Sequence, residues 1–216
     1  MSVPSDPDAR AAKSEQTRAR LLEGAMTAFS ELGFHGTSTR HIATAAGMSP
    51  AAVYVHYDSK EELLFRISLQ GHREILEIVR VAAASSDDPV TQLHTVARDF
   101  AIYHARHHVS ARVVNYELAS LNADHLAEIV ALRAQIDDVV TRVLADGMAA
   151  GVFSTPDPRM AAVAMIGSGI DVARWFRDGR SWSPHDVGAF YGDAALRLVG
   201  ATADSPETPA TPSPEP

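Results

Sequence analysis

Apolar residues recur at intervals of three and four along most of the chain, which is the spacing of one face of an α-helix. Leu21, Leu22, Ala25, Phe29 and Leu32 follow this spacing and predict a first helix over residues 14–32. No segment alternates apolar and polar residues over the length of a β-strand. The pattern therefore predicts an all-α fold of about nine helices.

Several helix starts can be located from the residues that open them. The pairs Asp88-Pro89, Asp157-Pro158 and Ser183-Pro184 each place a capping side chain before a proline that suits the first helical position. Ser59 opens a longer helix that continues to about residue 84. We expect the later helices at about residues 89–107, 110–121, 123–150, 157–178 and 184–200.

Residues 37–60 contain short helical signals separated by almost no connecting residues. Ser38 can cap one short helix, and Gly47 suits the left-handed position just past its end. Ser49 as a cap and Pro50 at the first helical position then begin the next helix at once. This layout is typical of a helix-turn-helix, whose second helix is exposed along its outer face.

This stretch resembles the signature of TetR-type repressors, which reads Thr, Ile-Ala, Ala-Gly, Ser, Tyr, an aromatic residue and Lys-Glu-x-Leu. The matching residues are Ser38 to Ala43, Ala46-Gly47, Ser49, Tyr54, Tyr57 and Ser59 to Leu64. With the preceding helix, the resemblance covers about the first third of the chain. It implies a homodimer that binds a palindromic operator in double-stranded DNA, with its two heads in successive major grooves.

A recognition helix needs compact side chains where it approaches the bases and polar ones toward the phosphates. Ser49, Pro50 and Ala51 are compact enough for that approach. By analogy with the family, Tyr54 and His56 face the DNA backbone, whereas Tyr57 is expected in the core. The predicted DNA-binding residues are Thr39, Arg40, Ser49, Pro50, Ala51, Tyr54, His56 and Lys60.

Composition limits the other classes of function. The net charge of −8 argues against DNA contact by the whole molecule, but basic and acidic residues nearly balance over the first sixty residues. The chain has no cysteine, which suits a reducing compartment. It also shows no leader and no apolar run of membrane-spanning length, so we expect a soluble cytoplasmic protein without membrane contact.

The chain divides into four predicted regions. Residues 1–12 are expected to form a flexible arm, residues 13–60 the helix-turn-helix domain, residues 61–200 a ligand-binding and dimerisation domain, and residues 201–216 a disordered Pro-rich tail. The last two helices carry small and apolar residues that suit a dimer interface, unless that surface packs only within the monomer. These residues are Ala161, Ala162, Ala164, Gly167, Gly169, Ala189, Tyr191, Ala194, Leu196, Leu198 and Val199.

The later region also resembles the branch of this family that senses acyl-CoA thioesters. The most distinctive match is Arg174-Trp175-Phe176-x-x-Gly. The effector implied is small and apolar, either an acyl-CoA thioester or, as the alternative, an apolar drug or aromatic metabolite; Asp171 is unfavourable beside a CoA phosphate. The predicted pocket residues are Phe100, Tyr103, Asn115, Tyr116, Glu117, Arg133, Asp171, Arg174 and Trp175.

The sequence also bears on a metal site and on an enzyme or carrier function. His104 and His108 stand at the i and i+4 spacing that can share a metal, with His107 beside them, but histidines are also favoured near a helix carboxy terminus. With no cysteine and no neighbouring acidic residue, no metal or other cofactor is predicted. A helical-bundle enzyme or carrier would need catalytic or metal-ligand spacings that the chain lacks, so no enzyme activity is predicted.

Overall fold

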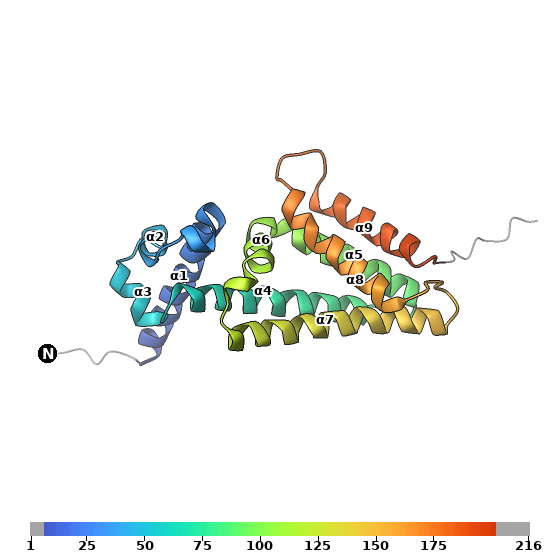
Figure 1. Cartoon of the computed structure of the whole chain (residues 1–216), viewed down its shortest axis with the longest axis horizontal. Helices are drawn as coiled ribbons and strands as arrows, with labels where there is room; N and C mark the ends of the chain where they lie inside the picture. The colour runs from blue at the N-terminus through green and yellow to red at the C-terminus, as the bar shows by residue number, and fades with distance from the viewer. Residues whose placement is uncertain (1–6, 202–216) are drawn as a thin grey trace, which may run out of the picture.

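The computed structural model describes residues 7–201, and within them it contains α-helices, one short 3₁₀ helix and no strand (Figure 1). The prediction of an all-α fold with about nine helices is confirmed for this part of the chain. In chain order the elements are α1 (Pro7–Gly36), α2 (Thr39–Ala45), α3 (Pro50–His56), α4 (Lys60–Ala83), α5 (Pro89–Arg106), α6 (His108–Tyr116), η1 (Leu118–Ser120), α7 (Ala123–Ala149), α8 (Pro158–Trp175) and α9 (Pro184–Leu198).

The capped starts of α5, α8 and α9 are confirmed. Asp88 accepts hydrogen bonds from the main-chain N–H groups of Val90 and Thr91. At the start of α8, Asp157 accepts hydrogen bonds from the main-chain N–H groups two and three residues later. Hydrogen bonds from the side chain and main chain of Thr91 hold the pKa of Asp88 below its usual value. Each cap satisfies main-chain donors that the first helical turn leaves without a partner.

The first helix is longer than predicted. It begins at Pro7, seven residues before the expected start at Ser14, so residues 7–12 are helical rather than part of a flexible arm. Proline at the first helical position and the Ala-rich segment after it favour this extension. Residues 1–6 of the predicted arm and residues 202–216 of the predicted tail lie outside the described residues.

Helices α1, α2 and α3 form a head at one end of the molecule, and α4 leads from the head into the body (Figure 1). The head core contains Phe29 of α1, Ile42 of α2 and Val53 of α3. Leu63 and Leu64, from the first turns of α4, pack in the same core. The predicted domain boundary at residues 60 and 61 therefore falls inside a packed helix.

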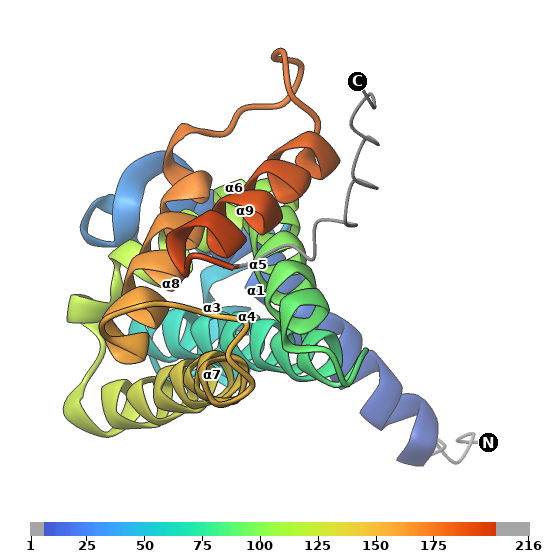
Figure 2. The same cartoon turned by 90° about the vertical axis from the view of Figure 1, so that its right-hand side faces the viewer.

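The body is a bundle in which α4 and α7 lie along one side and α5 packs against α4, α7, α8 and α9 (Figure 2). Its core includes Val79, Leu93, Val140 and Leu144. Helix α9 approaches α5 closely because its glycines lack a Cβ. A Cβ atom added at Gly192 would lie 2.7 Å from the His94 Nε2.

Candidate DNA-binding surface and ligand cavity

Hydrogen bonds hold both the start of α2 and the turn between α2 and α3. The Ser38 hydroxyl accepts a bond from the His41 N–H, and the His41 Nδ1 accepts one from the Ser38 N–H, each at 3.3 Å. Gly47 adopts φ of 64°, in the left-handed region that favours glycine. The Arg20 guanidinium of α1 donates to the Ala46 carbonyl at 2.8 Å. The predicted helix-turn-helix is confirmed, and its turn is tied to α1.

Helix α3 presents compact residues to solvent at its start. Pro50 and Ala51 are exposed, while Val53 is fully buried against the head core. Ser49 is the N-cap residue of α3 and Pro50 opens the helix, as predicted, but the Ser49 side chain makes no capping hydrogen bond. The main-chain carbonyl of Ser49 instead accepts the Ala52 N–H at 3.0 Å. The exposed Ser49 hydroxyl is therefore available to a phosphate oxygen.

Other predicted DNA contacts lie on or near the same surface. The Thr39 hydroxyl and the Tyr54 hydroxyl are 3.1 Å apart and join α2 to α3, and the Tyr54 side chain is 59% exposed. Arg40 is exposed on α2, and His56 is half-buried at the end of α3. Tyr57 is buried, as predicted.

Lys60 occupies a different environment from the one predicted. Its ammonium donates to the main-chain carbonyls of Phe34 at 2.7 Å and Thr37 at 2.8 Å, and it lies 4.3 Å from the centre of the Phe34 ring. Two of its three N–H bonds are thus used within the head. The chain reverses after Gly33, which adopts φ of 69°, and so brings these carbonyls to the start of α4. Lys60 braces the head rather than projecting freely toward DNA.

A cavity of about 460 Å³ lies among α1, α4, α5, α6, α7 and α8. This volume falls within the range of pockets that hold small organic molecules. Much of its wall is apolar, including Leu22, Met26, Ile67, Ile75, Val114 and Ile136. Because Leu22 and Met26 belong to α1, the wall includes the head as well as the body.

Four of the predicted pocket residues line this cavity, namely Phe100, Tyr103, Asn115 and Arg133. The Asn115 amide nitrogen donates to the Ala111 carbonyl at 2.9 Å. The Tyr103 hydroxyl donates to a Glu74 carboxylate oxygen at 3.0 Å. Burial and the adjacent Glu74 carboxylate raise the pKa of Tyr103, so it remains a neutral donor at physiological pH.

The other five predicted pocket residues do not line this cavity, and three of them, Tyr116, Glu117 and Arg174, line a separate hollow beside α1 and α6. The Asp171 carboxylate pairs with Arg174 at 3.0 Å and lies 3.5 Å from the Tyr116 hydroxyl. Glu117 accepts a hydrogen bond from the Phe34 N–H at 3.4 Å, and Trp175 is 39% exposed. Helix α6 ends at Tyr116, and the last cavity residue of α8 is Ile170, so these side chains lie beyond the cavity.

Two buried histidines, missed as pocket residues from the sequence, face the cavity from α4 and α5. His72 is 3% exposed and His104 is 4% exposed. The Nδ1 of His72 lies 2.8 Å from the Ser68 carbonyl, and that of His104 lies 2.9 Å from the Phe100 carbonyl. Burial lowers the pKa of both rings, to about 4 for His104, so both are neutral at pH 7.

The three side chains of the His-x-x-His-His motif, His104, His107 and His108, do not point toward one common site. His104 lines the cavity, whereas His108 is directed to the Ala105 carbonyl at 3.0 Å and packs edge-on against Phe176. His107 is exposed and stacks against Tyr103. Within residues 7–201, no group of three or more His, Asp or Glu side chains is placed to hold a metal ion.

Charge in the cavity is mainly acidic. Glu23 of α1, Glu74 of α4 and Asp137 of α7 line it, against the single arginine Arg133. Burial raises the pKa of Asp137, and the nearby Arg133 opposes that change. An entering molecule with several negative charges would therefore be repelled by three carboxylates and attracted by one guanidinium.

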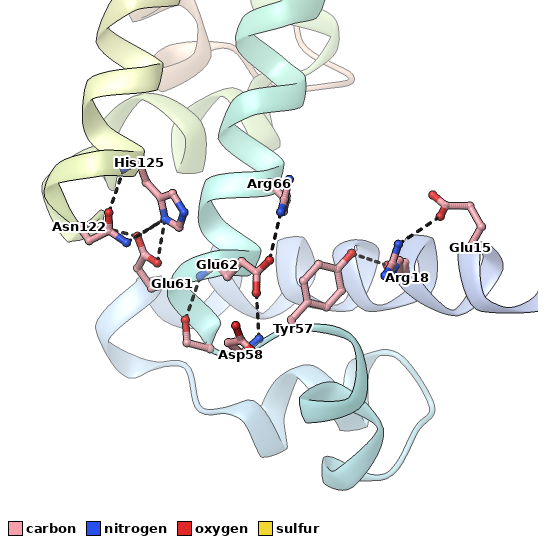
Figure 3. Close-up of polar contacts among 10 residues, drawn as sticks. Glu15, Arg18, Tyr57, Asp58, Glu61, Glu62, Arg66, Asn122 and His125 are labelled. Atoms are coloured by element: carbon pink, nitrogen blue, oxygen red, sulfur yellow. Dashed lines mark hydrogen bonds and ion pairs between the residues drawn. The ribbon is translucent and has the colours of Figure 1, made fainter. Parts of the chain in front are cut away.

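Polar contacts join the head to the body at the start of α4 (Figure 3). The Glu61 carboxylate lies 2.9 Å from the His125 Nδ1 of α7 and accepts the Asn122 N–H at 2.9 Å. The His125 ring stacks on Phe65 with their centres 3.8 Å apart. Together with the bond from Phe34 to Glu117, these contacts connect the head to α6 and α7.

Every helix within residues 7–201 is too short or too polar to cross a bilayer.

Two family models match the chain. The model described as "Tetracyclin repressor-like, C-terminal domain" matches residues 86–199, and the model described as "Bacterial regulatory proteins, tetR family" matches residues 21–67. The "HTH-type transcriptional repressor KstR2" of Rhodococcus jostii (strain RHA1) is 29% identical over 180 residues, covering 81% of this chain and 86% of that protein. The similarity to the "HTH-type transcriptional regulator UidR" of Escherichia coli (strain K12) spans only 39% of that protein's length.

Solved structures share the whole architecture. A bacterial regulatory protein in the tetR family from Rhodococcus RHA1 superposes with a TM-score of 0.83 at 38% identity, covering 87% of this chain and 98% of that one. The structure of AibR in complex with isovaleryl coenzyme A and operator DNA has a TM-score of 0.77 at 23% identity, covering 86% of this chain and 100% of that one. At that identity the second likeness shows the fold alone.

Proposed function

The chain belongs to the TetR family of bacterial regulatory proteins, and we propose that it represses transcription by binding a palindromic operator as a dimer until a small apolar effector enters its cavity. Membership makes it a DNA-binding transcriptional regulator rather than the helical-bundle enzyme or carrier considered as an alternative. Since such a regulator acts on the genome, we place it in the cytoplasm.

The proposed DNA contacts lie on the exposed surface of α2 and α3. Ser49, Pro50 and Ala51 permit close approach to the major groove, and the unbonded Ser49 hydroxyl is suited to a phosphate. Thr39, Arg40, Tyr54 and His56 complete the contact surface. Lys60 supports it indirectly by holding the end of α1 against the start of α4.

One head supplies few positive charges, so useful affinity requires two. We propose that α8 and α9 form the dimer interface, because both carry exposed apolar side chains. Val163 is 66% exposed on α8, and Phe190 and Leu198 are 65% and 49% exposed on α9. Some predicted interface residues instead pack inside the monomer, including Ala162, Gly169 and Val199.

The dimer proposal is tested by placing a charge on the exposed face of α9. We expect Phe190→Glu to convert the dimer to a monomer in sedimentation analysis and to weaken operator binding at least tenfold, because a buried unpaired carboxylate is costly. Ala134→Glu on α7, where the native residue is also exposed, serves as the control and should leave the dimer intact. A dimer that persists in the Phe190 variant would place the interface elsewhere.

The cavity supports an effector that is apolar and small. An acyl chain fits its apolar wall, but three carboxylates against one arginine disfavour the phosphates of coenzyme A inside it. If the effector is an acyl-CoA thioester, its head group would have to remain outside this cavity. An apolar drug or an aromatic metabolite meets the same wall without that conflict.

The observation that carries the regulatory proposal is that α1 of the head forms part of the cavity wall, through Leu22, Glu23 and Met26. A ligand in the cavity touches the head directly. It favours head positions that accommodate it, by the difference between its affinities for the two states. The contacts of Glu61 with α7 and of Glu117 with α1 would transmit a shift between head and body.

Fluorescence anisotropy on DNA from the upstream region of its own gene tests this function. We expect salt-sensitive binding that an apolar effector releases, and a loss of roughly a hundredfold for Ala51→Glu, because the added carboxylate faces phosphate. Ala134→Glu is the matched control and should bind as the wild type does. The panel contains acyl-CoA thioesters, the matching free acids and apolar aromatics. Equal operator binding by both variants would contradict the assigned surface.

A further inference from the structure

The cavity contains two polar groups that the proposed function leaves unused. The Nδ1 atoms of His72 and His104 each face a main-chain carbonyl one turn earlier in their own helix, at 2.8 and 2.9 Å. A carbonyl oxygen accepts hydrogen bonds and cannot donate them, so Nδ1 must carry the ring proton. In the neutral ring this leaves Nε2 as a hydrogen-bond acceptor.

Neither Nε2 has a hydrogen-bond partner within residues 7–201, where the contacts of both rings involve Nδ1 or ring stacking. Among these residues, only the Ser68 hydroxyl is a fully buried side-chain polar atom without a hydrogen-bond partner. The two Nε2 atoms also lack a partner, so they are not fully buried and keep some accessible surface. Both residues line the cavity, and the rest of each ring is buried. Two unsatisfied acceptors are thus directed into an otherwise largely apolar chamber.

We propose that the cavity selects an uncharged apolar molecule with a hydroxyl group, alcoholic or phenolic, which donates to the Nε2 of His72 or His104. Satisfying a buried acceptor favours a ligand that has a donor over one that has none. This inference rests on the proposed function, because it assumes that the cavity is the effector site.

Charged groups around the rings disfavour an anionic ligand. Arg133 and Asp137 line the same cavity from α7, Glu74 from α4, Glu23 from α1, and His107 from the junction of α5 and α6. A carboxylate supplies only acceptors, so it would bind these rings only if they became protonated. For His104, with a pKa of about 4, the charged form is roughly one part in a thousand at pH 7. A thioester carbonyl likewise has no proton to donate.

The ring protons can be tested without any ligand. In nitrogen-15 spectra of the full-length protein, we expect His72 and His104 to be neutral at pH 7 to 8 with the proton on Nδ1, and His104 to remain so down to pH 6. A ring protonated on Nε2, or charged at pH 7, would overturn the proposal.

Calorimetry then compares 4-pentylphenol, 4-pentylanisole and 4-pentylbenzoate at pH 7.5, in two buffers with different ionisation enthalpies. We expect the phenol to bind at least tenfold more tightly than the anisole, without proton uptake, and His72→Leu/His104→Leu to reduce this preference to twofold or less. His72→Gln/His104→Gln provides a second variant that retains polar groups. Equal binding of phenol and anisole, benzoate binding with proton uptake, or no binding by any probe would overturn it.

The same probes separate this inference from the proposed function. Benzoate that binds with proton uptake and releases the operator would preserve the effector role and reject the hydroxyl preference. A phenol that binds with the expected preference but leaves operator binding unchanged would support the preference and reject the effector role for this cavity.

Discussion

The head and the body of this regulator are packed in different ways. In the head, α1 and α2 approach so closely that a Cβ at Gly24 would lie 2.8 Å from the Ala46 nitrogen and 2.9 Å from the Ile42 carbonyl oxygen. In the body, the close approach at Gly192 meets a side chain, that of His94, rather than main chain, and the helices together with α1 surround a cavity of about 460 Å³ lined by two buried neutral histidines. The head is therefore packed to keep one shape, whereas the body leaves a space that a small molecule can enter.

The largest effect is expected from adding a side chain between α1 and α2. Gly24→Val places atoms against main chain, so it should destabilise the protein by roughly 3 kcal/mol and abolish operator binding. Gly36→Val lies past the break in α1 at Gly33, where a Cβ meets only the Leu32 Cβ at 3.6 Å, and it should cost about 1 kcal/mol or less. Urea unfolding measures both. A similar loss of stability in the two variants would contradict the close approach of α1 and α2 at Gly24.

The second effect is a loss of folding stability at acid pH. An unfolded histidine titrates near pH 6.5, whereas folded His104 titrates at about pH 4, so the unfolded state binds more protons between these values. The stability from the neutral buried ring is present above pH 6.5 and is lost as the pH falls toward 4, by about 3 kcal/mol.

Urea unfolding at several pH values checks this expectation. His104→Gln should flatten the dependence between pH 6.5 and 4 relative to the wild-type protein. An unaltered pH dependence in His104→Gln would show that the ring is not a major source of acid sensitivity in the body.

The smallest effect separates two serines within the head. Ser38 caps α2, so Ser38→Ala should destabilise the protein by about 1 kcal/mol. Ser49 makes no capping bond, so Ser49→Ala should change stability by less than about 0.5 kcal/mol and yet weaken operator binding several-fold. Thermal unfolding and anisotropy measure the two quantities. Equal losses of stability would mean that the hydroxyls have the same role.

Local patterns allowed most of the fold to be predicted. A capping side chain before proline acts within one helical turn, so the starts of α5, α8 and α9 could be read from adjacent residues. The extension of α1 was missed because apolar spacing is absent from residues 7–12, although Pro7 and the alanines that follow favour a helix there.

The cavity was harder to predict because its wall joins residues far apart in the sequence. Phe100, Tyr103, Asn115 and Arg133 were identified as polar or aromatic interruptions of apolar helices. Trp175 is also an aromatic residue on an apolar helix, so it was predicted as a pocket residue, but it lies past the end of the cavity. His72 carries no local signal, since its orientation depends on how α4 packs against α5 and α7.

The place of α1 in the cavity wall also affects how effector measurements should be compared. If the effector lowers operator affinity by some factor, the operator must lower effector affinity by that same factor, because both follow from one coupling free energy. Titrating the purified protein alone therefore measures the tighter of two effector affinities. The population bound to DNA responds at a higher effector concentration, so the number of operators in the cell sets part of the threshold for induction.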